Sequence, residues 1–455
     1  MSDQPEDPVE AASDLIRRAL KGPQDAEGLA AELAEIHPAD LAEVYEQLDD
    51  AQQDLLIQRL DLETIADLLE ELDDEDTLEA VEDIAPGRLA DLLDEMEPDE
   101  AADLLGDLPP GQARVLLEQM EDADEVRPLL GYPDETAGGL MTTSFVALRR
   151  QTTAEQAIQF LREVSPTSEI PYYLYVVDRD QKLKGVVGFR DLVIAQPQSP
   201  MQEIMDPDVI SVAVGVDQEE VARQMSHYSL AAIPVIDATE RLVGVITHDD
   251  ILEVIEEEAT EDIYRLANVS DTELEPDSPL REQVRGRLPW LFLNMLTALF
   301  ASWVVSNFET LIGEIAILAA FQSVVAGLGG NSGSQNIVMV VRALALDRLD
   351  RRKIWSILGR QVLVGLLQGV IVGAVVAAVV TFLRGDFHLG LILLLALTAN
   401  MVVAAIVGTL VPLFLARIGK DPAVASTILL TAATDSFGFF IFLMLASIFV
   451  RFFDF

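Results

Sequence analysis

One acidic residue stands inside a long apolar stretch near the end of the chain. Asp435 lies midway along the apolar segment 423–450, and Thr431 and Thr427 precede it by four and eight residues. In a helix this spacing places the three side chains on one face. A charge inside a membrane is costly and should face a cavity, a partner or an ion, and no Lys or Arg stands at a similar depth. Because Mg²⁺ prefers oxygen ligands and releases its water reluctantly, one carboxylate per subunit would suffice, and we predict Asp435, Thr431 and Thr427 as cation ligands.

A second polar group interrupts another apolar segment. The run Gly329-Gly-Asn-Ser-Gly-Ser-Gln-Asn336 is too polar for a helix that faces lipid, and such residues are tolerated there only when buried in protein or lining water. The alternative is close helix packing through small residues, as in the glycine seam of segment 354–382 (Gly365, Gly369, Gly373). We predict Asn331 as a cation ligand and place five further residues at the pore or in its packing: Gly329, Gly330, Gly333, Gln335 and Asn400.

Five apolar segments must position these residues. They cover about 289–306, 314–342, 354–382, 388–416 and 423–450, and each is long enough for the ~20 residues that cross a bilayer as a helix. Lys and Arg gather before the first segment and in the second and fourth connections, which predicts a cytoplasmic N-terminus and leaves Phe455 outside. The acidic, polar residues Met1 to Glu10 show no signal peptide, in agreement with that orientation.

A twelve-residue period runs from Leu41 to Met120. Apolar residues recur in trios such as Val44, Tyr45 and Leu48, whose spacings of three and four place each trio on one face of a short helix. Prolines, also at this period, fall where the helices should begin. The sequence therefore predicts a superhelix of short helices, each buried against its neighbours, with Asp and Glu at most outer positions.

An internal duplication follows in residues 138–258. Segments beginning at Val176 and Val235 match at a spacing of 59 residues, and each indicates strand, tight turn, strand and helix. This looks like a tandem CBS pair, a regulatory module that often binds adenosine nucleotides. The nucleotide pattern of that family, Thr or Ser with Asp three residues later, is kept as Thr247 and Asp250, whereas the first copy has Gly188 in place of the hydroxyl residue. One site for ATP or another adenosine nucleotide is one interpretation, and a purely structural pair is the other.

Acidic residues dominate the chain before about residue 289. The net charge of -47 argues against nucleic-acid partners, because two polyanions repel each other, and favours cations. In the helix expected after the second copy, Glu256, Glu257 and Glu258 follow Asp250, and so dense a carboxylate cluster either binds hard cations or forms a solvated face.

The remaining composition narrows the functional classes. There is no cysteine, which excludes disulfides and thiolate metal sites. We find no nucleophile–base set, phosphate loop or metal-hydrolase spacing, so an enzyme is not expected.

The order of these parts resembles the MgtE family of magnesium channels over nearly the full chain. The most specific marks are Gly330-Asn-Ser-Gly-Ser-Gln335, and Asp421-Pro-Ala-Val-Ala-Ser426 followed by Asp435. The resemblance implies a multidomain membrane protein: an all-α superhelical N-terminal domain (1–132), an α/β tandem CBS pair (133–258), a linking helix that plugs the pore (259–287) and a five-helix α transmembrane pore domain (288–455).

The resemblance also implies a mechanism. Two subunits would form a homodimer in the inner (plasma) membrane, with the pore between them and Mg²⁺ selected at Asp435. Cytoplasmic Mg²⁺ would bridge the acidic domains and hold the linking helix over the pore. When Mg²⁺ falls, repulsion between the acids would shift the population towards the open state.

Two other classes of membrane protein remain open at this point. One is a secondary transporter for Mg²⁺ or another divalent cation such as Co²⁺, coupled to Na⁺ or H⁺, because polar glycine runs also occur in the broken helices of such transporters. The other is a membrane sensor that transports nothing. An unpaired Asp435 argues against the sensor, which has little use for an acid inside the membrane.

Overall fold

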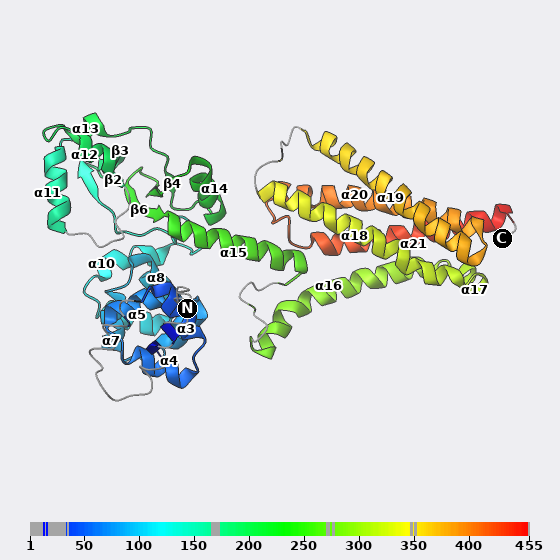
Figure 1. The fold of residues 1–455 in the computed structure, drawn as a ribbon, viewed down its shortest axis with the longest axis horizontal. Coiled ribbons are helices and arrows are strands. Elements are labelled where there is room, and N and C mark those ends of the chain that lie inside the picture. The colour runs from blue at the N-terminus through cyan, green and yellow to red at the C-terminus, as the bar shows by residue number, and fades with distance from the viewer. Residues whose placement is uncertain are drawn as a thin grey trace, which may run out of the picture. The chain divides into compact units, whose positions relative to one another are not determined.

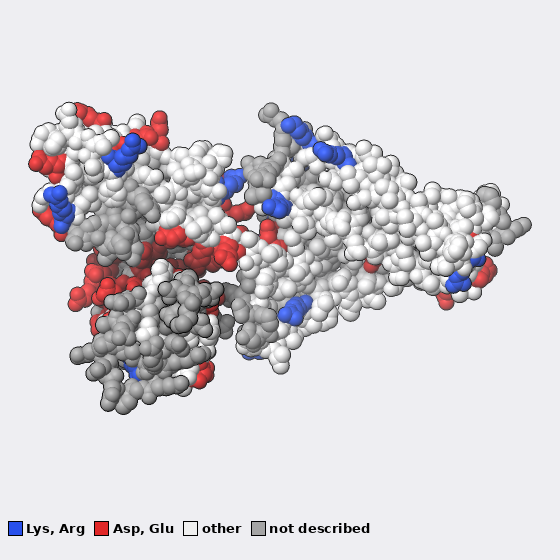
Figure 2. Space-filling model, viewed as in Figure 1, with Lys and Arg blue, Asp and Glu red and all other residues white. Residues whose placement is uncertain are grey.

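A computed structural model of the chain describes residues 12, 13, 15, 16, 33, 36–164, 173–269, 274, 278–345, 349 and 353–453. The chain forms two compact units, Met1–Ile255 and Glu256–Phe455, and the boundary between them falls inside one helix, α15 (His248–Ala267). The first unit consists of short helices and two small sheets, and the second mainly of long helices (Figure 1). On the face shown in Figure 2, Asp and Glu gather on the first unit, whereas the second unit is largely uncharged.

Residues 38–117 form seven short helices that begin at intervals of twelve residues, which confirms the predicted repeat. Asp49 and Asp61 begin two of them by accepting hydrogen bonds from the backbone N–H groups of Gln52 and Thr64. Four others have Pro in their first position, where the missing N–H costs nothing. The seven helices are α3 (Pro38–Glu46), α4 (Asp50–Ile57), α5 (Leu62–Leu69), α6 (Asp74–Val81), α7 (Pro86–Leu93), α8 (Pro98–Asp107) and α9 (Pro110–Leu117).

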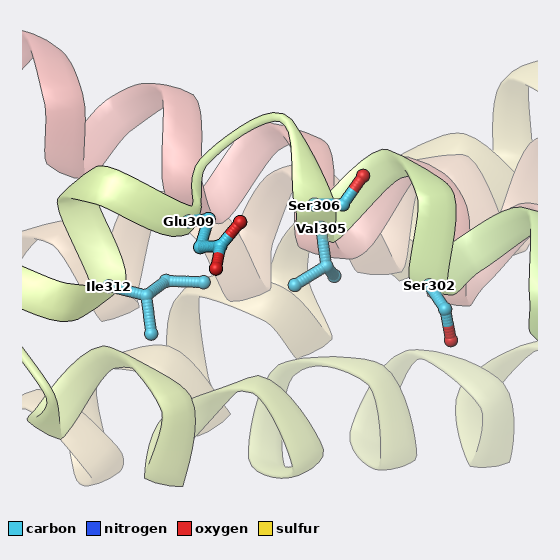
Figure 3. Close-up of a pocket in the computed structure, with 5 residues that line it drawn as sticks. All are labelled: Ser302, Val305, Ser306, Glu309 and Ile312. Atoms are coloured by element: carbon cyan, nitrogen blue, oxygen red, sulfur yellow. The ribbon is translucent and has the colours of Figure 1, made fainter.

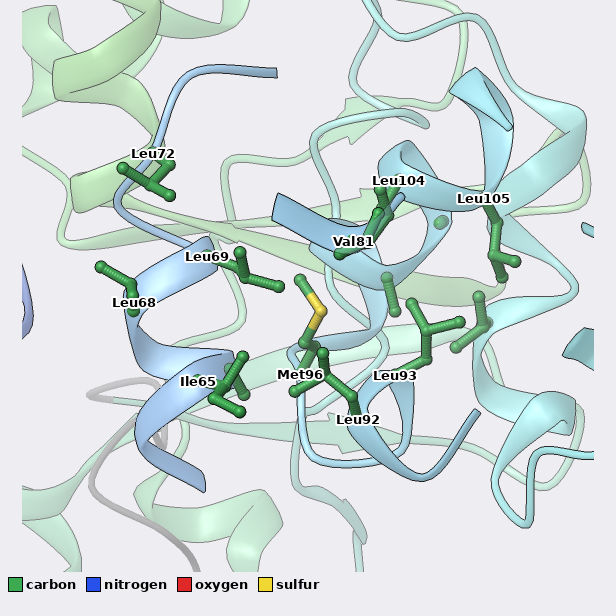
Figure 4. Close-up of a cluster of buried hydrophobic side chains, with 14 of the residues drawn as sticks. Ile65, Leu68, Leu69, Leu72, Val81, Leu92, Leu93, Met96, Leu104 and Leu105 are labelled. Atoms are coloured by element: carbon green, nitrogen blue, oxygen red, sulfur yellow. The ribbon is translucent and has the colours of Figure 1, made fainter. Parts of the chain in front are cut away.

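Alternate helices of this series pack side by side. Helix α5 contacts α3 and α7, α7 contacts α9, and α6 contacts α4 and α8. Their apolar faces form a buried cluster that includes Ile65, Leu92 and Leu93 (Figure 4). Full burial of such a side chain contributes about 1.5–3 kcal/mol, so each short helix is stabilised mainly by its neighbours. Two short elements, α10 (Ala123–Val126) and η1 (Leu129–Gly131), complete this part.

Some acidic side chains join the end of one helix to the start of the third helix after it. Glu70, which follows α5, accepts a 2.7 Å hydrogen bond from the backbone N–H of Glu97, before α8. Asp94, after α7, accepts hydrogen bonds of 2.9 and 3.0 Å from the N–H groups of Glu121 and Asp122, before α10. Helix N-termini favour such carboxylates, so part of the acidity serves the fold.

Two three-stranded sheets confirm the predicted duplication. In each sheet the first strand pairs with the second in parallel, and the second pairs with the third antiparallel. The register shifts at equivalent places, Val176/Val177 and Val235/Ile236. The strands are β1 (Ala147–Arg149), β2 (Tyr173–Val177) and β3 (Leu183–Gly188), then β4 (Val212–Ala213), β5 (Ala232–Ile236) and β6 (Leu242–Thr247). The helices around them are α11 (Ala154–Val164), α12 (Phe189–Ile194), α13 (Met201–Ile204), α14 (Gln218–Tyr228) and α15.

The range predicted as a linking helix, 259–287, is not one helix. Helix α15 ends at Ala267, where Asn268 takes a left-handed conformation with φ of 62°. Asn tolerates this conformation better than most residues, and it is a common way to end a helix. The next long helix, α16 (Leu280–Ser306), begins at Leu280 and continues into the first apolar segment. The end of α15 and the start of α16 therefore divide the predicted range.

The second unit contains α16, a short helix α17 (Glu309–Glu314) and four long helices: α18 (Ile317–Ala345), α19 (Ile354–Arg384), α20 (Phe387–Arg417) and α21 (Ser426–Phe453). Among the described residues, four segments are long and apolar enough to cross a bilayer: Gln283–Ser306, Ile354–Arg384, Phe387–Arg417 and Ser426–Phe452. Helix α18 has the length, but its polar run 329–336 lowers its hydropathy, so the predicted fifth span does not stand out by composition. Helix α20 is the most buried helix of this unit and packs against α18, α19 and α21.

Candidate cation sites

Helix α21 carries Asp435, and its carboxylate is half-buried. Within the described part of the chain, Asp435 forms neither a hydrogen bond nor an ion pair, so both of its oxygens are available to a ligand. Thr431, one turn earlier, is exposed, and its hydroxyl donates a 2.9 Å hydrogen bond to the carbonyl of Thr427. The Thr431 oxygen keeps lone pairs for a second partner. This face of α21 is therefore an oxygen-lined surface with one uncompensated carboxylate.

Thr427, the third predicted ligand on α21, has partners on α15. Its hydroxyl donates to the carbonyl of Leu266 at 3.2 Å and accepts a 2.9 Å hydrogen bond from Nδ2 of Asn268. In this conformation the Thr427 hydroxyl is engaged by the end of α15, and its role as a cation ligand stays a prediction. The sequence contains no signal for this contact, because about 160 residues separate the partners.

An ion pair holds the same end of α15. Nη1 of Arg265 donates to the Asp421 carboxylate at 2.6 Å, and the guanidinium also pairs with Glu261 on its own helix. Burial raises the pKa of the nearby Asp262 to about 6, and the negative charges of Asp421 and Glu258 add to the effect. Arg265 thus stands among several carboxylates where α15 meets the connection between α20 and α21.

Helix α18 runs unbroken through the polar glycine segment and has two different faces there. Gly329, Gly333 and Asn336 are buried, whereas Asn331 and Gln335 are exposed on the other side. The buried glycines allow close approach: a Cβ added at Gly333 would lie 2.3 Å from Leu430 Cδ1 of α21. A Cβ at Gly330 would lie 3.8 Å from Thr434 Oγ1, also on α21. The contacts with Leu430 and Thr434 place this polar segment beside the turn of α21 that leads into Asp435.

Asn400 of α20 is fully buried and lies between two glycines. A Cβ added at Gly329 of α18 would lie 2.2 Å from its Nδ2, and one at Gly438 of α21 would lie 2.7 Å from the same atom. Nδ2 donates a 2.9 Å hydrogen bond to the carbonyl of Val325 on α18. The structure therefore places Asn400 in the packing of three helices rather than on a surface that water could line.

Thr247 and Asp250, the two predicted nucleotide-binding residues, are bonded to each other at the start of α15. The backbone N–H and the hydroxyl of Thr247 both donate to Asp250 Oδ2, at 2.9 and 2.8 Å. The Asp250 carboxylate also lies near Asp99 of α8, which is buried. Burial raises the pKa of Asp99 well above its usual value, and the charge of Asp250 adds to it.

Two further acids of α8 belong to this buried cluster. Burial raises the pKa of Glu100 to about 9, and the charges of Asp99 and Asp103 add to the effect. Burial, with Asp134, Asp74 and other acids nearby, raises the pKa of Asp103 to about 7. The sequence did not single out Asp99, Glu100 or Asp103, because every repeat carries similar acids and only the docking of α8 distinguishes them.

The other predicted acidic ligands are more exposed to solvent. Glu256 and Glu257 are exposed on α15 and Glu258 is half-buried. In the described ranges, no three His, Cys, Asp or Glu side chains stand close enough to hold a metal ion together. Direct coordination by three protein ligands is therefore not preformed, although Mg²⁺ usually keeps several of its waters and needs only one or two carboxylates.

A separate cavity of about 280 Å³ lies where α16 meets α17 (Figure 3). Its lining contains one carboxylate, Glu309, and the hydroxyls of Ser302 and Ser306. None of the residues predicted from the sequence lines it. A single acid in an open cavity gives no reason to place the cation pathway there.

Known families match three successive parts of the chain. Residues 36–135 match the MgtE intracellular N domain, 137–197 and 201–257 match CBS domains, and 322–445 match the MgtE family of divalent cation transporters. Among curated relatives, the magnesium transporter MgtE of Thermus thermophilus is 38% identical over 71% of this chain and 72% of its own length. The magnesium transporter MgtE of Enterococcus faecalis is 36% identical over 73% of each chain.

Solved structures resemble the first part of the chain. The cytosolic domain of the Mg²⁺ channel MgtE in complex with ATP is 37% identical, with a TM-score of 0.50, and covers 53% of this chain and 99% of its own. The soluble part of a magnesium transporter is 34% identical, with a TM-score of 0.51, over 55% of this chain and 99% of its own. With these matches, the curated relatives and the apolar helices of the second unit, the chain is a membrane protein that belongs to the MgtE family of divalent cation transporters.

Proposed function

We propose that this protein is a Mg²⁺ channel whose pore passes Asp435 and whose opening is controlled by Mg²⁺ on the cytoplasmic side. The observation that carries the pore assignment is the half-buried Asp435, which has no partner among the described residues although it stands in a long apolar helix. Such a carboxylate is too costly to keep in a membrane unless it meets a cation. The curated relatives are magnesium transporters, which supports Mg²⁺ as the ion.

The pore is proposed to lie between two copies of the chain. Asn331, Gln335 and Thr431 are exposed polar residues on helices whose remaining surface is mostly apolar. Lipid would leave the side-chain amides of Asn331 and Gln335 unsatisfied, whereas water between two subunits would solvate them and could also bind the Thr431 oxygen. A twofold axis there would bring two copies of Asp435 to one hydrated ion. In this arrangement α18 is the fifth membrane span, its polar face turned from lipid to the pore.

Closure is proposed to use the acidic cluster around α8 and the start of α15. Asp99 lies beside Asp250, and Glu100 and Asp103 follow it on α8. The pKa values of all three acids are raised mainly by burial, and repulsion from neighbouring carboxylates adds to the effect. A divalent cation relieves this repulsion as protons do, so Mg²⁺ would favour the docked arrangement. The exposed acids Glu256, Glu257 and Glu258 are proposed as further contacts for hydrated ions.

A nucleotide role is proposed for the second CBS copy. Thr247 and Asp250 keep the hydroxyl and carboxylate that ribose recognition would need, and the similar cytosolic domain named above was solved with ATP. In the structure these two groups satisfy each other, so a nucleotide would have to compete with the Thr247–Asp250 hydrogen bond.

The orientation that we propose in the inner membrane follows from the positions of the basic residues. The N-terminus lies in the cytoplasm and the C-terminus outside.

Flux measurements test the channel directly. Purified protein in liposomes, given a membrane potential but no Na⁺ or H⁺ gradient, should take up Mg²⁺. Asp435→Ala should lower this uptake by more than about tenfold, which corresponds to losing 1.4 kcal/mol of cation stabilisation. Glu309→Gln, which neutralises an acid of the same unit outside the proposed pathway, should retain the uptake.

Two outcomes would change the proposal. Normal uptake by Asp435→Ala would remove Asp435 from the ion pathway. Uptake that requires a Na⁺ or H⁺ gradient would assign the protein to coupled secondary transport of Mg²⁺ or another divalent cation such as Co²⁺. The continuous α18 does not favour this second class, in which the polar glycine run would be expected to break the helix.

A further inference from the structure

We propose that Asn400 and Asn336 are positioning residues that fix the rotation of α18 about its own axis, so that Asn331 and Gln335 face the ion pathway. The inference rests on the proposed function, since it concerns which face of α18 the pathway uses. It assigns no ion contact to either asparagine. Both are buried in the helix packing and act through the backbone of a neighbouring helix.

Each asparagine makes hydrogen bonds to the neighbouring helix, and we call each of these connections a pin. The first pin runs from Asn400 on α20 to α18. Asn400 is 0% exposed, and its Nδ2 donates to the carbonyl of Val325 at 2.9 Å. It reaches this carbonyl because Gly329, one turn later on α18, has no side chain in the way, and Gly438 leaves room on the α21 side. An added Cβ at Gly329 would meet the amide at 2.2 Å, so the amide fills the space that a side chain would take.

The second pin runs in the opposite direction, from α18 to α20. Asn336 is 4% exposed, and its Nδ2 donates to the carbonyl of Ala405 at 2.9 Å and to Thr409 Oγ1 at 2.8 Å. Here the glycine is on α20: a Cβ at Gly408 would lie 2.9 Å from the Gly333 carbonyl and 3.3 Å from the Asn336 amide. The two pins are therefore reciprocal, each inserting an amide where the other helix has a glycine.

The pins bracket the polar segment and determine which residues it presents. Val325 and Asn336 lie at the two ends of the stretch that contains Asn331 and Gln335. At 3.6 residues per turn, Asn331 is on the face opposite Gly329 and Gly333, which agrees with its exposure. Turning α18 by one residue position would carry Asn331 and Gln335 towards the packed side and break both pins.

Rotation would otherwise be weakly resisted. The small residues on α18 allow its neighbours to approach closely, but they have few side-chain atoms that could interdigitate and resist rotation. Helices in a membrane also gain no hydrophobic driving force from packing on one another. Breaking either pin would leave a buried amide without its acceptors, which is unfavourable in an apolar environment. Within the described residues, Oδ1 of each asparagine accepts no hydrogen bond, so each amide is oriented by its donor side alone.

The absence of cysteine in the chain allows this rotation to be measured by single introduced thiols. Ser334→Cys lies on the exposed face of α18, and Ile337→Cys lies on the face that is 0% exposed. In protein reconstituted into liposomes, a membrane-impermeant thiol reagent should modify Ser334→Cys rapidly and Ile337→Cys slowly. Mg²⁺ should slow the modification of Ser334→Cys if this face lines the ion pathway.

The two pins are then removed separately with a side chain of similar shape, as Asn400→Leu and Asn336→Leu. Each should reduce the ratio of the two modification rates at least severalfold, and each should change the uptake of Mg²⁺ relative to a larger divalent cation such as Ca²⁺. Thr398→Val is the matched control, because among the described residues the Thr398 hydroxyl bonds within α20 alone, to the Leu394 carbonyl at 2.7 Å. It should alter neither quantity.

The outcomes separate this inference from the proposed function. If wild-type protein takes up Mg²⁺ but both Leu variants keep the modification ratio and the ion preference, the positioning role is wrong while the channel stands. If wild-type protein takes up no Mg²⁺, the proposed function fails, and the modification ratio still decides whether the pins fix α18. If one Leu variant does not assemble, as judged by its elution and melting, the other variant alone decides the question.

Discussion

Unpaired or crowded carboxylates occur in both units of the protein, and the sequence predicted only some of them. Asp435 was predictable because an acid in a long apolar segment is conspicuous by itself. Asp99, Glu100 and Asp103 were not, because the repeat places acids at most outer positions and only the packing of α8 distinguishes these three. A property that depends on a contact distant in sequence leaves no local pattern.

The acidic cluster should make the first unit less stable at high pH. For carboxylates with raised pKa values the folded state prefers the protonated form. The stabilisation from that proton is complete below the ordinary pKa of about 4 and is lost as pH rises through the folded pKa values. Those values are about 7 for Asp103 and about 9 for Glu100, so the loss should extend across pH 4–9.

Thermal melting of the full chain checks this. Without Mg²⁺ the transition of the first unit should fall in temperature between pH 6 and pH 9, and Mg²⁺ should restore it. Glu100→Gln should stabilise the unit by about 1–2 kcal/mol at pH 8. The whole pKa shift, at ~1.4 kcal/mol per pKa unit, would give a larger value, and we lower it because the side chain keeps some contact with water. A melting temperature that is equally sensitive to pH in Glu100→Gln would contradict this assignment of the charge.

At the scale of single elements, most helices could be predicted and their connections could not. The twelve-residue period located α3 to α9, and the five apolar segments correspond to α16 and α18–α21. The range 259–287 was wrongly predicted as one helix. Asn268 ends α15 in a left-handed conformation, and no pattern in the sequence indicated this helix end. The predicted lining residue Thr427 also gained unforeseen partners, Leu266 and Asn268, for the same reason.

The end of α15 should hold the closed arrangement through Arg265. This side chain is 36% exposed, so its ion pair with Asp421 is worth about 1 kcal/mol rather than the 1.5–3 kcal/mol of a buried charged hydrogen bond. Arg265→Ala should therefore raise the Mg²⁺ concentration that half-closes the channel by about fivefold. Arg223→Ala, which removes a surface pair with Glu220 in the first unit, should leave that concentration unchanged.

Current or flux recorded against cytoplasmic Mg²⁺ measures this shift. An unchanged half-closing concentration in Arg265→Ala would mean that the Arg265–Asp421 pair does not contribute to closure. Asn268→Ala, which removes the hydrogen bond from the residue after α15 to Thr427 of α21, gives an independent measurement of the same region.

At the scale of the whole molecule, the sequence predicted that an acidic part is followed by an apolar, membrane-spanning part. Nearly all the charge belongs to the first unit and most of the apolar length to the second, and composition alone indicates a membrane protein with an acidic soluble part. The assembly is beyond one chain's sequence, because the polar faces of α18 and α21 only require water or a partner and do not specify which. The twofold pore therefore needs its own test.

Cross-linking provides that test. Thr431→Cys on the exposed face of α21 should form a disulfide between two subunits under mild oxidation, because a twofold pore brings the two copies together. Val375→Cys, on a surface of α19 that is 60% exposed, should face lipid and stay reduced. Equal cross-linking of both variants would indicate random collision, and no cross-linking of Thr431→Cys would place α21 away from the dimer axis.

The helical repeat of the first unit has a consequence for how the protein is made. Its characteristic contacts join residues that are close in sequence: 27 residues separate Glu70 from Glu97, and 31 separate Arg88 from the Ile57 carbonyl that it binds. Chains with such local contacts fold in microseconds to milliseconds, whereas a ribosome needs about 2–6 s to add 31 residues. We therefore expect each turn of the superhelix to form soon after it emerges during synthesis. The acidic body would then be complete before the first apolar helix requires a membrane.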